Sequence, residues 1–119
     1  LDDRAYYVVC PSSNLKLSGD LAPNFLFDNK PDYICMGTDS MASSENQSVF
    51  GELKIIERYR SISLVSLLKF ATINGAKALN IDSEYGSIRV GKRPGINLIT
   101  DMDVTRGILG QKAKFSKLV

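Results

Sequence analysis

The chain has 119 residues, of which 44% are hydrophobic, so it is long enough and apolar enough for one modest domain with a packed core. Its formal net charge is +2 and its Lys and Arg residues are scattered, which argues against nucleic acid as a main partner. The chain contains no histidine, which excludes a histidine-based zinc site, a Ser-His-Asp triad and a Cys-His pair within these residues.

The first expected element is a β-strand over residues 5–10, an apolar run of aromatic and β-branched residues. The run lacks the alternation of a half-exposed strand, so we expect a strand buried on both faces, as in a parallel sheet. Pro11 and the Ser-Ser-Asn that follows predict a turn at its end. Residues 15–32 are expected to be mostly loop, with one short helix in which Pro23 takes the first position, ending near Asp28.

A second apolar strand is expected over residues 33–36, and Gly-Thr-Asp-Ser at 37–40 follows it. Ser44 and Gln47 have the spacing of a capping box, in which a Ser side chain and a Glu or Gln three residues later satisfy each other's backbone N–H groups. The sequence therefore predicts that an amphipathic helix begins after Ser44 and runs to about Tyr59.

Another helix is expected after Ser63, which has the residue type of an N-cap. Apolar residues then recur at steps of three and four up to about Asn80, the clearest periodicity in the chain. Asn74 and Gly75 interrupt this pattern, and Gly costs about 1 kcal/mol inside a helix. We therefore expect close packing of the helix against its neighbours at that point.

Beyond Asn80, glycines separate short runs of β-type residues at 87–90, 96–100 and 114–118, which predicts a small, separate β element. In the first part of the chain, buried strands alternate with helices, which is typical of an α/β layer with parallel strands. Two parallel strands make a poor sheet with open edges. The chain is therefore expected to be a piece of something larger, and to self-associate through its exposed strand edges.

The chain begins at Leu1 rather than Met, which also favours a fragment or a processed product. No apolar stretch approaches the roughly 18 residues of a membrane span, and the N-terminus lacks the pattern of a secretion signal. Cys10 and Cys35 each lie in an apolar run and are expected to be reduced core thiols. We therefore expect a cytoplasmic protein with no membrane partner.

Four segments, in this order, resemble the chlorohydrolase, guanine deaminase and adenosine-derivative deaminase branch of the amidohydrolase superfamily. They are VCPSSNLKL at 9–17, MGTDSMAS at 36–43, ATINGAKAL at 71–79, and GSI with VGK within 86–92. The resemblance implies a (β/α)8 barrel, whose active site lies at the carboxyl ends of the strands. It implies that the segments correspond to the segment after barrel strand 7, to strand 8 with its aspartate, to the helix after strand 8, and to the return into a small β domain.

By this resemblance, residues 1–85 are the C-terminal part of the barrel and residues 86–119 the C-terminal segment of the small β domain. The complete enzyme would be a metal-dependent hydrolase or deaminase acting on a non-peptide C–N or C–Cl bond of a small-molecule substrate. Asp39 would bind the catalytic divalent metal, zinc or iron, and accept a proton from the water that the metal activates. The family's other metal ligands are histidines on earlier strands, so the chain alone is expected to bind no metal and to be inactive.

Ser12, Asn14, Ser40 and Ser43 lie in the two loops that would rim the pocket, which makes them candidates for substrate binding. Ordinary turn chemistry is the alternative for these four residues, and a turn or helix-capping role is the alternative for Asp39. Val9 stands where family members often have His, which predicts a different specificity for a ring substrate. Two alternatives to a catalytic fragment are a non-catalytic remnant acting as a self-associating or interaction module, and one half of a barrel that a second chain completes.

Overall fold

The structure, a computed structural model, describes residues 4–45 and 47–119, so the start of the expected barrel part at residues 1–3 lies outside the described residues. Strands and helices follow in the order β1 (Tyr7–Val9), α1 (Pro11–Ser18), α2 (Asn24–Asn29), a 3-10 turn η1 (Pro31–Tyr33), β2 (Ile34–Met36), α3 (Val49–Tyr59), α4 (Leu64–Phe70), α5 (Ile73–Ala78), β3 (Asn97–Thr100) and β4 (Lys114–Lys117).

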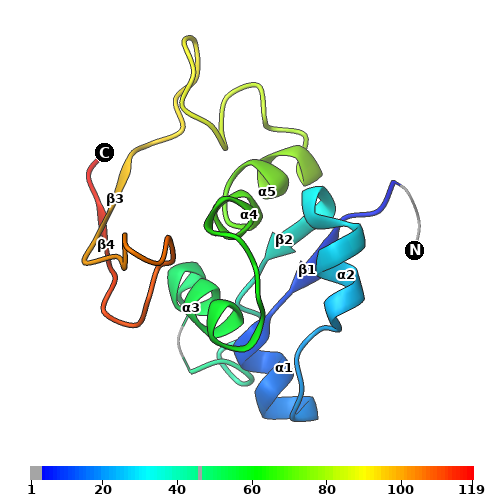
Figure 1. Cartoon of the computed structure of the whole chain (residues 1–119). Helices are drawn as coiled ribbons and strands as arrows, with labels where there is room; N and C mark the ends of the chain where they lie inside the picture. The colour runs from blue at the N-terminus through cyan, green and yellow to red at the C-terminus, as the bar shows by residue number, and fades with distance from the viewer. Residues whose placement is uncertain (1–3, 46) are drawn as a thin grey trace.

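Strands β1 and β2 form a parallel pair near the centre of the molecule, as the sequence predicted (Figure 1). Tyr7 pairs with Ile34 and Val9 with Met36, and Gly37 extends the ladder by donating its N–H to the Val9 carbonyl at 2.9 Å. All of β2 is buried, and α3, α4 and α5 contact it. Burial of β1 on both faces was a wrong prediction, because the Val8 side chain is 66% exposed.

The chain thus has a mixed α/β fold, and its described residues close no barrel. The two strands run in the same direction, so their carboxyl ends meet at one edge, where α1 and the loop after β2 lie together (Figure 1). No helix in the described ranges is long and apolar enough to cross a membrane.

Helix α1 occupies residues for which the sequence predicted a turn and a loop. Pro11 takes its first turn, where a missing N–H is harmless, and Gly19 ends it with a left-handed φ of +73°. The second short helix was predicted one position early, because Pro23 is its N-cap and α2 runs from Asn24 to Asn29.

The predicted capping box at Ser44 and Gln47 was wrong, although the helix does end at Tyr59 as expected. Ser48 caps α3 instead, and its hydroxyl accepts the Gly51 N–H at 3.1 Å. Ser44 is buried and donates its hydroxyl to a carboxylate on α3, so its side chain is already engaged in a tertiary contact.

Ser63 caps α4 as predicted, since its hydroxyl accepts the Ser66 N–H at 3.1 Å. The periodic run is not one helix, however, because it breaks after Phe70 and resumes as α5. The hydroxyl of Thr72 donates to the Leu68 carbonyl at 2.6 Å at this break, and Thr72 itself has non-helical backbone angles.

The predicted close packing around Asn74 is confirmed. The Asn74 side chain is buried and donates to the carbonyl oxygens of Pro31 at 2.9 Å and Ile34 at 2.8 Å, which ties α5 to β2. The prediction was wrong for Gly75, because no atom lies within 4 Å of where its Cβ would be.

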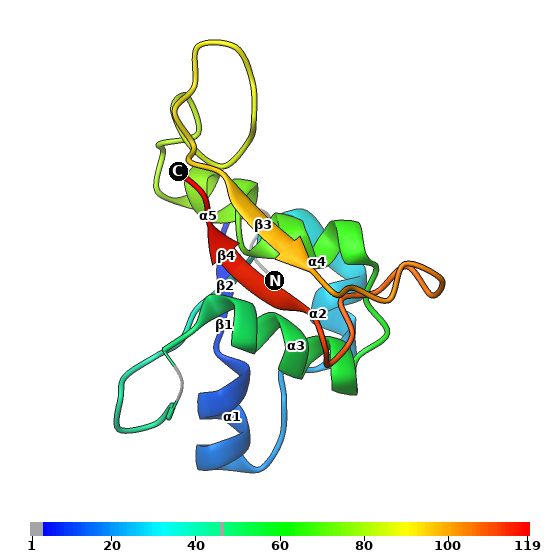
Figure 2. The same ribbon diagram turned by 90° about the vertical axis from the view of Figure 1, so that its left-hand side faces the viewer.

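Strands β3 and β4 form the predicted C-terminal β element, an antiparallel pair in which Asn97 faces Lys117 and Thr100 faces Lys114. Residues 87–90 are not a strand, which corrects that part of the prediction. The pair stands beside α3 (Figure 2), where Phe115 stacks on Phe50 with ring centroids 5.6 Å apart. The division of the chain after residue 85 stays a prediction.

Candidate functional site

Asp39 lies just beyond β2, at the edge where the carboxyl ends of the parallel strands meet. Its backbone has a φ of +59°, a left-handed conformation that Asp and Asn tolerate better than other side chains with a Cβ. The residue is exposed, so this backbone presents the carboxylate to solvent at the end of a buried strand.

Two hydrogen bonds hold the Asp39 carboxylate. Its Oδ2 accepts the Ser13 hydroxyl at 2.7 Å, and its Oδ1 accepts the Ser40 N–H at 2.8 Å. The Ser13 hydroxyl first, then the Ser40 N–H and the Ser43 hydroxyl, hold the pKa of Asp39 below its ordinary value. Because hydrogen bonds to the charged form favour it, Asp39 is an ionised acceptor at neutral pH.

The structure brings two of the predicted substrate-binding residues to Asp39. The hydroxyls of Ser40 and Ser43 lie 3.2 Å apart, and the Ser43 hydroxyl also bonds the Ser40 carbonyl at 3.3 Å. Asp39, Ser13, Ser40 and Ser43 form what we call the Asp39 cluster. Its carboxylate, hydroxyls and N–H group all come from α1 and the loop after β2.

The other two predicted residues lie outside this cluster. Ser12 is half-buried and lines a neighbouring pocket. Asn14 accepts the Ser18 hydroxyl through its backbone carbonyl, and it is not among the residues that contact Asp39 or line this pocket in the described part of the chain. The residue between them, Ser13, makes the contact to Asp39, although no signal in the sequence marks it.

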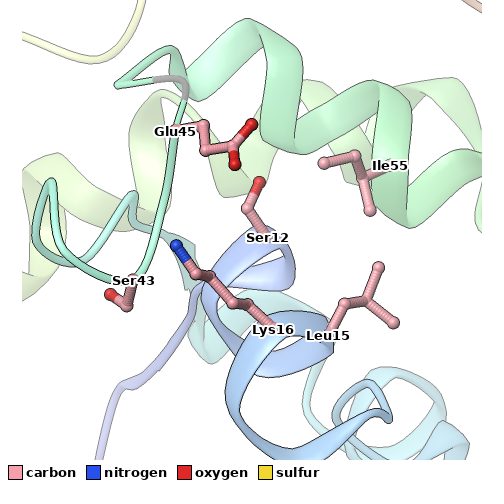
Figure 3. Close-up of a pocket in the computed structure, with 6 residues that line it drawn as sticks. All are labelled: Ser12, Leu15, Lys16, Ser43, Glu45 and Ile55. Atoms are coloured by element: carbon pink, nitrogen blue, oxygen red, sulfur yellow. The ribbon is translucent and has the colours of Figure 1, made fainter.

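The pocket has a volume of about 500 Å³ and borders the Asp39 cluster through Ser43. Figure 3 shows the Glu45 carboxylate, from the loop after β2, next to the Ser12 hydroxyl, with the Lys16 side chain of α1 extending along the other side of the recess. The Lys16 ammonium also donates to the Ala42 carbonyl at 3.1 Å, which links α1 to that loop. The pocket is thus an open recess whose lining is more apolar than polar, with Leu15 and Ile55 beside one cationic and one anionic side chain.

Glu52, on α3, bonds residues next to the cluster, and no signal in the sequence marks it either. Although it carries a carboxylate, it is only 1% exposed. Its Oε2 accepts the Ser12 N–H at 2.8 Å, and its Oε1 accepts the Ser44 hydroxyl at 3.4 Å. Glu52 therefore connects α3 both to α1 and to the loop after β2.

The described residues contain no group of three or more His, Cys, Asp or Glu side chains that could hold a metal ion. Asp39 offers one exposed, ionised carboxylate, which suits one position in a metal's coordination shell but is no site by itself. Both cysteines are free thiols, as predicted, and burial is the first cause that raises the pKa of Cys10 and of Cys35. Neither thiol is therefore an activated nucleophile at neutral pH.

Replacing Ser13 with Ala is expected to raise the pKa of Asp39 toward its ordinary value of 3.8, because the largest cause of its lowering is removed. A lowered pKa stabilises the fold above the unfolded pKa, and this stabilisation is lost as pH falls through the folded pKa. The variant is therefore expected to be less stable than the parent at neutral pH, with a smaller difference in acid.

Carbon-13 NMR titration of the Asp39 carboxyl measures the pKa, and urea unfolding at neutral and acidic pH measures the stability. Ser12→Ala is the matched control, since the Ser12 contact to Glu52 uses the backbone N–H and survives the change. An Asp39 pKa that moves equally in both variants contradicts the assignment of Ser13.

A mixed α/β chain with an ionised carboxylate at the carboxyl end of a parallel strand is typical of α/β proteins that bind ligands at that edge of the sheet. Sequence comparison identifies the family within this class. The sequence model of the Amidohydrolase family matches residues 2–118, and the chain belongs to this family.

Curated relatives include deaminases of adenosine derivatives and an imidazolonepropionase. The chain is 41% identical to a 5-methylthioadenosine/S-adenosylhomocysteine deaminase from Thermoanaerobacter pseudethanolicus, over 78% of this chain and 23% of that protein. It is 33% identical to an imidazolonepropionase from Picrophilus torridus, over 86% of this chain and 26% of the relative. A 5'-deoxyadenosine deaminase from Methanosarcina acetivorans is 34% identical, over 77% of this chain and 22% of the relative. The chain thus spans about a quarter of the length of these relatives.

Proposed function

We propose that the chain is the C-terminal part of a metal-dependent hydrolase that deaminates a small molecule at a non-peptide C–N bond, with Asp39 as the catalytic acid–base residue. The observation that carries the proposal is the placement of Asp39, an ionised and exposed carboxylate at the carboxyl end of a buried parallel strand. Family membership and the names of the relatives support the reaction class.

In the complete polypeptide we place β1 and β2 as barrel strands 7 and 8, with residues 86–119 in a small β domain. Two features support this placement. The strands are parallel and adjacent, and the antiparallel pair β3–β4 stands apart from them. The active site would then lie at the edge that carries Asp39, as in other barrels of this architecture.

The metal, zinc or iron, would lower the pKa of the attacking water toward neutrality when bound. This chain would contribute Asp39 to it, and the remaining ligands would come from residues outside this sequence, which has no histidine. The Asp39 carboxylate would accept a proton from the attacking water and donate it to the departing amino group. The Ser13 hydroxyl and the Ser40 N–H fix the carboxylate for this transfer.

The polypeptide encoded by the complete reading frame is expected to release ammonia from at least one of 5'-methylthioadenosine, S-adenosylhomocysteine and 5'-deoxyadenosine. A coupled ammonia assay measures this release, with a chelator expected to abolish it and added zinc or iron to restore it. Chloride release from a chlorinated ring compound tests the C–Cl alternative. Turnover that persists unchanged without metal would contradict the proposal.

A second candidate function is a self-associating module without catalysis, and exposed apolar surface favours it. Val8 is 66% exposed on β1. An open groove of about 930 Å³, partly lined by Phe50, Ile96 and Phe115, also runs between α3 and β3–β4. Sedimentation of this chain alone over a range of concentrations tests this function, since a monomer at all concentrations excludes it.

A further inference from the structure

We propose that Glu52 is a positioning residue, which holds the two segments that carry the Asp39 cluster in their working geometry. This inference rests on the proposed role of Asp39. The starting observation is burial, because the Glu52 side chain is 1% exposed. Carboxylates are almost never fully buried unless they are paired or hydrogen-bonded, since leaving water costs several kcal/mol. The groups that hydrogen-bond this carboxylate therefore indicate which segments it holds in place.

The first contact is to α1. The Oε2 atom of Glu52 accepts the Ser12 N–H at 2.8 Å, in the first turn of the helix. The residue before α1, Cys10, supplies no side-chain cap. Glu52 thus supplies from α3 the acceptor that a helix N-terminus ordinarily finds in its own N-cap residue. Its negative charge is also favourable at that end of the helix dipole.

The second contact is to the loop after β2, where the Ser44 hydroxyl donates to Oε1 of Glu52 at 3.4 Å. Ser13, next to Ser12, bonds one oxygen of Asp39, and Ser40 bonds the other. One buried carboxylate therefore joins the two segments that together hold both oxygens of the Asp39 carboxylate. Movement of either segment would separate a donor from Asp39, which is why Glu52 controls the geometry without touching the reacting atoms.

The same helix offers a matched control. Glu57 accepts the N–H groups of Leu109 at 2.8 Å and Gly110 at 2.9 Å. It is also a carboxylate on α3 that anchors backbone amides of another segment. The segment it holds lies next to the β3–β4 pair and takes no part in the Asp39 cluster. Loss of either glutamate removes two hydrogen bonds to another segment, but only loss of Glu52 should change the geometry of Asp39.

The test compares Glu52→Met, Glu52→Gln and Glu57→Met in the complete, metal-loaded polypeptide. Met keeps the length of the side chain and removes its acceptors. Gln keeps an oxygen for the Ser12 N–H and can donate its amide to the Ser44 hydroxyl. Measured quantities are kcat, KM, the melting temperature, and hydrogen–deuterium exchange of the amides in residues 10–18, 37–45 and 101–113.

For Glu52→Met we expect kcat to fall by about 10- to 100-fold, because a displacement near 1 Å at a reacting group has an effect of that size. The change in KM should be smaller, and amide exchange should rise in residues 10–18 and 37–45. Glu52→Gln should recover most of kcat and of the protection. Glu57→Met should raise exchange in residues 101–113 and leave kcat within about twofold of the parent.

Two outcomes overturn the positioning role. One is unchanged exchange in residues 10–18 and 37–45 in Glu52→Met. The other is an equal fall of kcat in Glu52→Met and Glu57→Met at an equal loss of melting temperature, which shows a general structural effect. Failure of the proposed function is distinguishable, because it appears as retained turnover in Asp39→Asn. Amide exchange in residues 10–18 and 37–45 does not depend on turnover. If Asp39→Asn retains turnover, this exchange alone tests the positioning role of Glu52.

Discussion

Replacing Asp39 with Asn in the complete polypeptide is expected to lower kcat by about 10²- to 10⁴-fold, the range over which a positioned acid–base group contributes. Asn has no titratable carboxylate to take a proton, and its neutral amide is a weak metal ligand. The fold should survive, because Asn tolerates the left-handed φ of +59° as well as Asp does. The Asn oxygen can also still accept a hydrogen bond from Ser13 or Ser40. Steady-state kinetics and metal content per polypeptide measure the effect.

Asp101→Asn is the control for this change. Asp101 has the same left-handed backbone, with a φ of +56°, and follows β3 as Asp39 follows β2. Its carboxylate forms an exposed ion pair with Lys114 at 3.3 Å, a kind of contact that contributes at most about 1 kcal/mol. We expect unchanged turnover for Asp101→Asn. Substantial activity in Asp39→Asn would show that the catalytic role has been assigned to the wrong residue.

Replacing Asn74 with Ala is expected to lower the free energy of unfolding by about 1–3 kcal/mol. The side chain is buried, and both of its hydrogen bonds end on backbone carbonyls, those of Pro31 and Ile34. Alanine leaves these carbonyls without that donor, and an unsatisfied buried polar group costs about 1–3 kcal/mol. Urea unfolding of this chain, followed by circular dichroism, measures the loss.

Asn29→Ala is the matched control for Asn74. The Asn29 amide also donates to a backbone carbonyl, that of Phe25 at 2.7 Å, but this bond is exposed and water can replace it. Its loss should cost under about 0.5 kcal/mol, as is usual for surface positions. Equal losses in the two variants would mean that the contact of α5 with β2 does not stabilise the fold as inferred.

The elements that the sequence predicted well are those whose signals are local. The apolar run before Gly37 gives β2, and the hydroxyl of Ser63 caps α4 because both are decided by residues near in sequence. The β3 and β4 strands also follow their β-type runs. The apolar composition of residues 33–36 predicted β2 well, because a strand buried between layers is apolar throughout. The same signal located β1 but overstated its burial, since Val8 is 66% exposed.

Helix α1 could not be predicted in this way, because its sequence favours a turn. Ser and Asn compete with the helix by bonding nearby backbone groups, so residues 12–14 have low helix propensity. The compensating acceptor, Glu52, lies 40 positions away along the chain. Pro11 was the one local signal, since Pro is favoured in a first helical turn.

The candidate site likewise combines residues that the sequence predicts with residues whose contacts depend on the tertiary fold. Asp39 was predicted because a family resemblance marks its segment, and its contact with Ser40 is local. Ser13 and Glu52 were missed because their roles exist only after α1 packs on the loop after β2 and on α3. With residues 11–14 predicted as a turn, nothing in the sequence marks Ser13 as the partner of Asp39.

The parallel pairing of β1 and β2 also fixes the stage of folding at which the Asp39 cluster forms. Ser13 and Asp39 are separated by 26 positions, and parallel strands cannot be joined by a tight hairpin. The crossover through α1 and α2 must be complete, with its loop-closure entropy already lost, before the hydroxyl reaches the carboxylate. A partly folded chain, such as one still leaving the ribosome, therefore carries the aspartate without its orientation, so the oriented carboxylate is acquired together with the tertiary fold.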